Sequence, residues 1–121
     1  MSGAVLVVSE SAESAAALGA MLGSDHWTIH QACSCDEAIA LLGRDRVSVV
    51  VCEPRLPDGN WRDMLRYTSH APNGPALIVT SNAGDEGLWA EVLNLGGYDV
   101  LAQPFDQSEV ARVIASAGRT R

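Results

Sequence analysis

Basic residues, long apolar segments and paired cysteines are scarce or missing in this sequence. Its 8 Lys and Arg residues are outnumbered by 15 Asp and Glu residues, which gives a formal net charge of −7. Because nucleic-acid phosphates are bound mainly by Lys and Arg, this balance argues against direct nucleic-acid binding. No apolar run reaches the roughly 20 residues of a membrane-spanning helix, and the N-terminus lacks the pattern of a signal peptide. We therefore expect a cytoplasmic chain that contacts neither nucleic acid nor a membrane.

The 3 cysteines cannot all pair, and their spacing favours free thiols in a reducing compartment. Cys52 closes an apolar run and is expected to be a small buried side chain. His30, Cys33 and Cys35 lie close together in the sequence, but their spacing is not that of a zinc site and no fourth ligand is evident. We expect packing and helix capping at these residues, and no required cofactor.

The sequence does contain a regular alternation of short apolar runs and longer amphipathic stretches. With 121 residues and 47% apolar content, the chain is long and apolar enough to form a single domain over residues 1–121. The apolar runs predict strands at about 4–8, 27–31, 47–52, 76–80 and 98–102. The other stretches predict helices at about 11–22, 35–42, 61–67, 86–95 and 106–117.

Consecutive strand–helix units of this kind predict a parallel sheet that is covered by helices on both faces. Right-handed crossovers leave few topologies, and the flavodoxin-like (βα)5 arrangement with strand order 2-1-3-4-5 is the usual solution. We therefore predict this doubly wound α/β fold. Its crevice should lie at the carboxyl ends of the first and third strands.

Polar side chains follow the predicted strands and should gather at one edge of the sheet. They belong to Ser9, Glu10, Glu53, Thr80, Ser81 and Gln103. Two carboxylates in one site repel each other unless a cation or a proton intervenes, and Mg²⁺ accepts such ligands. One interpretation is a weak Mg²⁺ site at Glu10 and Glu53, or a modified phosphoryl site; the other is that both carboxylates point into solvent. No lysine ends a predicted strand, and Arg55 is the nearest cation in the sequence.

Four segments of the chain resemble the response-regulator receiver domain of two-component signalling. Segment 53–59 resembles the Asp-x-x-Leu/Met-Pro-Asp-Gly loop after the third strand, and segment 5–10 resembles the first strand with its acidic pair. Segment 78–81 resembles the end of the fourth strand, and segment 96–105 resembles the Gly-Ala-x-x-Tyr-x-x-Lys-Pro-Phe sequence. Because the four occur in order and at matching spacings, the resemblance covers nearly the whole chain and implies the same flavodoxin-like fold.

The active positions implied by this resemblance hold unusual residues. Glu53 stands where the family carries its phosphoacceptor Asp, and Gln103 stands where it carries the Lys that pairs with the phosphoryl group. Ser9 and Glu10 match the acidic pair that helps to bind Mg²⁺. The extra methylene of Glu displaces its carboxylate by about 1.5 Å, and misplacements of about 1 Å can cost about a hundredfold in rate. We therefore expect no phosphorylation of the normal Asp type.

The switch positions of the family lead to two accounts of Glu53. Thr80 keeps its usual identity, whereas Val100 replaces an aromatic switch residue and Trp61 replaces a glycine in the loop beside the site. Glu53 is either a permanent mimic of the phosphorylated state or a drifted residue in a docking module. Because Gln103 and Val100 replace the residues that would respond to the added charge, we favour docking.

The predicted helix at 86–95 carries two apolar stripes. The stripe expected to face the sheet consists of Leu88, Val92 and Leu95. The second stripe, Trp89 and Leu93, is expected to be partly exposed. In the family, the fourth helix, fifth strand and fifth helix form the output or dimer face. The positions matched on that face are Trp89, Leu93 and Val100, and exposed apolar groups there favour a protein interface.

These observations predict an atypical receiver domain, rather than an enzyme, that acts through protein contacts of that face. Its partner would be a histidine kinase or an output domain, and a homodimer is an alternative. A competing hypothesis is a response regulator that still accepts phosphate from a histidine kinase. A further one is a flavodoxin-like domain that binds a nucleotide or a flavin, although no phosphate-binding loop is evident.

Overall fold

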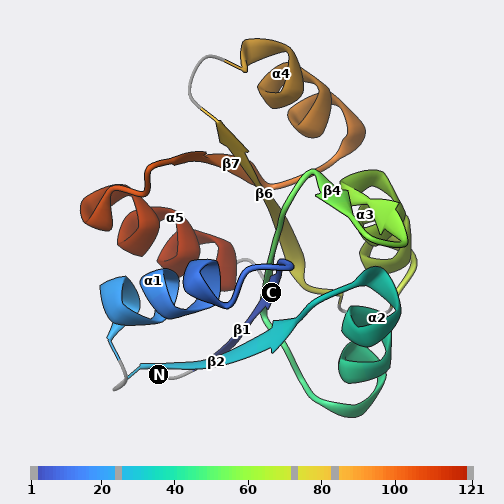
Figure 1. Cartoon of the computed structure of the whole chain (residues 1–121), viewed down its shortest axis with the longest axis horizontal. Helices are drawn as coiled ribbons and strands as arrows, with labels where there is room; N and C mark the ends of the chain where they lie inside the picture. The colour runs from blue at the N-terminus through green and yellow to red at the C-terminus, as the bar shows by residue number, and fades with distance from the viewer. Residues whose placement is uncertain (1–2, 24–25, 72–73, 83–84, 120–121) are drawn as a thin grey trace.

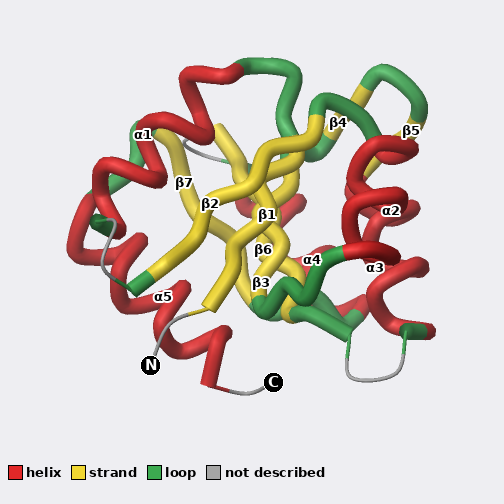
Figure 2. The backbone as a smooth tube through the Cα atoms, turned by 90° about the horizontal axis from the view of Figure 1, so that it is seen from below, coloured by secondary structure: helices red, strands yellow, loops and turns green. Residues whose placement is uncertain are grey.

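The computed structural model describes residues 3–23, 26–71, 74–82 and 85–119, and its centre is a five-stranded parallel sheet (Figures 1 and 2). The strand order is β2-β1-β3-β6-β7. The bounds are β1 Gly3–Val8, β2 Trp27–Ala32, β3 Val49–Cys52, β6 Ala76–Asn82 and β7 Asp99–Gln103. This order confirms the predicted flavodoxin-like order 2-1-3-4-5, with β6 and β7 as the fourth and fifth strands of the sheet.

Helices cover the sheet on both faces. On one face lie α1 (Ala12–Leu22) and α5 (Gln107–Arg119), which contact each other (Figure 1). The other face carries α2 (Cys35–Arg44), α3 (Trp61–His70) and α4 (Glu86–Leu95). Within the described residues, no helix has both the length and the apolar character that crossing a membrane requires.

The strands are apolar on both sides because both sides are buried. In β1, Val5 and Val7 join the core under α1 and α5, whereas Leu6 and Val8 join the core under the other helices. All four side chains are at most 2% exposed. Since consecutive strand residues point to opposite faces, an uninterrupted apolar run is what a doubly covered strand requires.

The segment between β3 and α3, predicted as a loop, contains a short antiparallel hairpin. Its strands are β4 (Arg55–Leu56) and β5 (Gly59–Asn60). The Asn60 side chain accepts a hydrogen bond from the N–H of Asp63 at 3.3 Å, and the Asp63 carboxylate accepts one from the N–H of Asn60 at 2.9 Å. This reciprocal capping starts α3 immediately after the hairpin.

The helix predicted from Trp61 is confirmed as α3, whereas the expectation that Trp61 lies in the loop beside the site is wrong. It is the first residue of α3, its side chain is only 2% exposed, and it packs in the core under α2, α3 and α4. The capping by Asn60 explains the difference, because it turns this position into a helical one whose side chain points inward. Trp61 therefore stabilises the fold and does not line the crevice.

The two apolar stripes of α4 are only partly as predicted. Val92 is fully buried and Leu88 is half-buried, but Leu95 is 53% exposed, so its predicted position against the sheet is wrong. The reason is that α4 packs against β6 and the edge strand β7, which cover only part of its apolar surface. Trp89 and Leu93 are 51% and 46% exposed, which confirms their predicted exposure.

Candidate functional site

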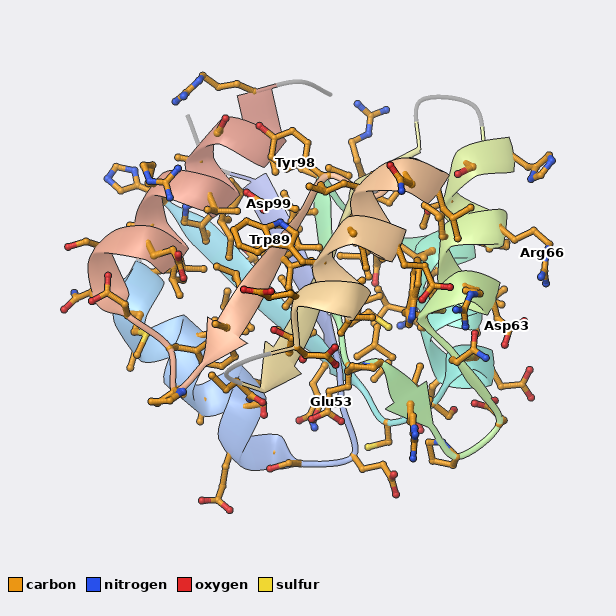
Figure 3. All side chains as sticks on the ribbon, turned by 90° about the horizontal axis from the view of Figure 1, so that it is seen from above. Glu53, Asp63, Arg66, Trp89, Tyr98 and Asp99 are labelled. Atoms are coloured by element: carbon orange, nitrogen blue, oxygen red, sulfur yellow. The ribbon has the colours of Figure 1, made fainter. Side chains whose placement is uncertain are left out.

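An open pocket of about 500 Å³ lies at the carboxyl ends of β3, β6 and β7. The residues that line it are Glu53, Pro54, Arg55, Thr80, Ser81, Asp85 and Gln103. Figure 3 shows Glu53 at the end of the sheet toward which the β6 and β7 arrows point. The structure therefore brings together Glu53, Thr80 and Gln103, as their positions after three separate strands predicted.

Ser9 and Glu10 are not among the residues that line this pocket. The Ser9 hydroxyl is fully buried; it accepts a hydrogen bond from the Ser11 N–H at 2.9 Å and donates one to the Ser11 carbonyl at 3.2 Å. Glu10 is exposed. Among the described residues, no three or more His, Cys, Asp or Glu side chains form a group suited to a metal ion. The weak Mg²⁺ site at Glu10 and Glu53 stays a prediction.

The charges of the pocket come from three side chains. Glu53 is half-buried, whereas Asp85 and Arg55 are exposed. Arg55 is the only cation among the described residues of the lining, and the full sequence contains no lysine. Gln103 contributes a neutral amide to the pocket. The pocket thus has two carboxylates and one guanidinium, and its buried hydroxyls belong to Thr80 and Ser81.

Asp85 is a pocket residue that the sequence analysis missed. It caps α4, and its carboxylate accepts a hydrogen bond from the Leu88 N–H at 3.1 Å. An Asp directly before a helix predicted to begin at Glu86 is an N-cap signal, and that signal was available in the sequence. What the sequence did not indicate is that this cap lies beside Thr80 and Gln103.

Asp58 joins the loop after β3 to the start of α2. Its carboxylate accepts hydrogen bonds from the N–H groups of Cys35 at 2.8 Å and Asp36 at 2.9 Å. The hydrogen bonds from Asp36 and then Cys35 favour the charged form and lower the pKa of Asp58 below its ordinary value. The next residue, Gly59, has little room for a side chain, because a Cβ there would lie 2.6 Å from Asp63 Oδ2 and 3.1 Å from Cys35 Sγ.

The cysteines are free thiols in different surroundings. Cys52 is fully buried and Cys35 is 7% exposed, whereas Cys33 is exposed. Burial, and then the nearby charge of Asp58, raise the pKa of the Cys35 thiol to about 11. Burial also raises the pKa of the Cys52 thiol. At neutral pH both buried thiols are therefore protonated, which gives them the character of packing groups rather than nucleophiles.

A second, smaller hollow lies beside the pocket, between α4, β7 and α5. Its volume is about 250 Å³, and we call it the acidic groove; its lining is Ser81, Asp85, Glu86, Trp89, Val100, Ala102 and Glu109. Figure 3 shows Trp89 between α4 and β7. Val100, predicted as an interface residue, is only 9% exposed. It therefore contributes to the inner wall of the groove rather than to the outer surface, because the inward-facing position on β7 is covered by α4.

The doubly wound five-stranded fold is that of a receiver-type signalling domain. The sequence matches the family described as the response regulator receiver domain over residues 5–115. This match spans nearly the whole chain, and the protein belongs to that family.

Curated relatives in Mycobacterium tuberculosis are longer proteins. The probable transcriptional regulatory protein TcrX is 35% identical over 107 residues, which cover 88% of this chain and 45% of TcrX. The DNA-binding transcriptional activator DevR/DosR is 32% identical over 104 residues, which cover 84% of this chain and 48% of that protein. The chain thus spans less than half the length of these two relatives.

Solved structures share the fold at low sequence identity. A putative response regulator from Chloroflexus aurantiacus has a TM-score of 0.90 at 18% identity, covering 98% of this chain and 99% of that one. The beryllofluoride-activated NtrC4 receiver domain dimer has a TM-score of 0.86 at 21% identity, covering 97% of each chain. At these identities the similarity establishes the fold alone.

Proposed function

We propose that this protein is an atypical receiver domain that is not phosphorylated in the usual way and acts through protein contacts of its α4–β7–α5 face. The observation that carries the proposal is the composition of the pocket. By the family resemblance, Glu53 stands at the acceptor position and Gln103 at the lysine position. Both line the pocket, where Asp85 adds a second carboxylate. These residues make a site that is poorly suited to receiving a phosphoryl group.

Phosphoryl transfer depends on positioning and on neutralising the charge that the transferred group carries. The longer Glu53 side chain moves the nucleophilic oxygen by about one carbon–carbon bond, and about 1 Å of misplacement can cost about a hundredfold in rate. A lysine contact to the phosphoryl group would contribute about 1.5–3 kcal/mol, which the neutral Gln103 amide does not supply. Asp85 adds repulsion, because an incoming phosphoryl group is itself negative.

The docking account explains the surface better than a permanent mimic of phosphorylation does. A mimic needs a group that responds to its charge, and the pocket has Gln103 and the face has Val100 where the family carries such groups. The large apolar side chains exposed in the described residues all lie on α4, namely Trp89, Leu93 and Leu95. Exposed apolar groups gathered on one helix favour a protein contact at that place.

Beryllofluoride, a phosphoryl analogue, tests the proposal. We expect fluorine NMR in the presence of Mg²⁺ to show no saturable bound signal for this chain, because the acceptor carboxylate is displaced and no lysine lies opposite. The NtrC4 receiver domain, which is described as beryllofluoride-activated, serves as the positive control. A saturable bound signal that disappears in Glu53→Gln would show that the site still accepts a phosphoryl group and would overturn the proposal.

A further inference from the structure

The acidic groove has an apolar inner wall and a negatively charged rim. Val100 and Ala102 line it from β7, and Trp89 lines it from α4 with 51% of its surface exposed. The carboxylates of the lining belong to Asp85, Glu86 and Glu109. No Arg or His belongs to the described residues of this lining. The groove therefore combines an accessible aromatic face with uncompensated negative charge.

The rim carboxylates take no part in the ion pairs of the described structure. Those pairs join Arg44 to Asp45, Arg62 to Glu91, and Arg66 to Asp63. Asp85 caps its own helix through one oxygen, and Glu109 donates its backbone N–H to Asp106. Within the described residues, the carboxylates of Glu86 and Glu109 make no hydrogen bond. Because like charges held together repel each other, an arriving cation would be favoured at this rim.

The groove also adjoins the pocket that contains Glu53. Ser81 and Asp85 line both hollows, so the negative charge of the pocket lies next to the rim of the groove. Arg55 lines the pocket but not the groove. The negative charge of the Glu53 carboxylate would therefore add to the attraction of the groove for a cation.

We propose that the acidic groove binds a segment of a partner protein that carries an arginine beside an apolar side chain. This inference rests on the proposed function, because it names the chemistry of the partner that the α4–β7–α5 face would contact. A guanidinium can stack on the indole of Trp89 while it pairs with Glu86 or Glu109. The adjacent apolar side chain would cover Val100 and Ala102.

Arg119 of this same copy is poorly placed to fill the groove. The groove lies at the start of α5, where Glu109 is located, whereas Arg119 ends that helix. A helix rises about 1.5 Å per residue, so Arg119, ten positions after Glu109, lies about 15 Å further along the axis. A second copy of the chain is a separate alternative that the test must distinguish.

The test is a titration of the whole chain with two tetrapeptides, followed by amide and indole NMR. One peptide is acetyl-Leu-Arg-Leu-Arg-amide, and the control replaces each arginine by citrulline, which has the same shape without the charge. We expect saturable shifts at the Trp89 indole and at the backbone amides of Val100 and Ala102. An exposed ion pair contributes a factor of about 1.5 to 5 in affinity, so two arginines should give roughly a fivefold preference over citrulline. High salt should reduce that preference.

Matched variants locate the effect. Glu109→Gln and Glu86→Gln should each lower the affinity for the arginine peptide by about twofold or more. Glu13→Gln, which removes the same charge from an exposed position on α1, should leave the affinity unchanged. Trp89→Leu should lower the affinity for both peptides, because it removes the aromatic face that each of them contacts.

Three results would overturn the proposal. They are equal affinity for the two peptides, shifts that map outside the groove, and the absence of shifts at millimolar concentrations of either peptide. A dimer that the arginine peptide dissociates would assign the groove to a second copy and would also contradict a separate partner. The titration contains no phosphodonor, so phosphorylation of Glu53 would refute the proposed function without affecting this test. Failure of the peptides would leave the phosphorylation claim intact.

Discussion

Glu53 and Gln103 line one pocket from the ends of β3 and β7. The two strands are not neighbours in the sheet, since β6 lies between them. The presence of a Glu carboxylate and a neutral amide in one pocket is therefore a property of the fold rather than of neighbouring sequence. It suggests that both substitutions act on the same step, the capture of a phosphoryl group.

The first prediction concerns restoration of that step. Glu53→Asp alone should gain little phosphorylation by a small-molecule phosphodonor, whereas Glu53→Asp combined with Gln103→Lys should be faster by about tenfold or more, because a charge-assisted contact of about 1.5–3 kcal/mol is added. Time courses of intact mass measure both rates. Equal rates in the single and double variants would mean that position 103 does not contribute.

The second prediction concerns Asp58, which caps α2 from the loop after β3. Its pKa is lowered in the folded state, so its contribution to stability is present above the ordinary value of 3.8 and is lost as the pH falls below it. Asp58→Asn should therefore unfold more easily than wild type near neutral pH, and the difference should shrink in acid. Denaturant unfolding at several pH values measures this. A difference that is independent of pH would contradict the role of the charge.

The third prediction compares two glycines. Gly59→Ala should destabilise the fold by about 1–3 kcal/mol, because the new Cβ would lie 2.6 Å from Asp63 Oδ2 in the cap of α3. Gly43→Ala is the matched control. Position 43 lies within α2, and nothing lies within 4 Å of the Cβ that the substitution adds, so it should stabilise the fold by about 0.4–1 kcal/mol. Chemical denaturation measures both, and similar effects at the two positions would contradict the contact at Gly59.

The fourth prediction separates two tryptophans. Trp89→Ala should change the free energy of unfolding by no more than about 0.5 kcal/mol, since its side chain is 51% exposed, while weakening whatever association uses the α4 face. Trp61→Ala should cost about 3–5 kcal/mol, since its side chain is 2% exposed. Thermal unfolding and sedimentation measure the two effects. A large loss of stability in Trp89→Ala would mean that this side chain packs in the fold.

Much of the fold was predictable because it depends on local patterns. Uninterrupted apolar runs such as that of β1 indicate strands buried on both faces, which predicts the layers. The strand order followed from right-handed crossovers and the usual five-strand topology. The meeting of Glu53, Thr80 and Gln103 followed from the rule that parallel strands end at one edge of the sheet. These inferences need only the period of the sequence and the position of strand ends.

Other features depend on contacts between distant residues and were missed. Asp58 capping α2 requires the loop after β3 to reach Cys35, which no local pattern indicates. Leu95 fits the sheet-facing spacing but is exposed because the sheet ends at β7, beneath α4. The placement of Asp85 between the pocket and the groove likewise depends on how α4 packs.

The most direct test of the account is the intact mass of the wild-type chain after incubation with Mg²⁺ and a small-molecule phosphodonor. The NtrC4 receiver domain, treated in parallel, controls for activity of the donor. The account predicts that the mass of this chain stays unchanged, because Glu53 does not gain a phosphoryl group. A stable gain of one phosphoryl group, abolished by Glu53→Gln, would contradict it.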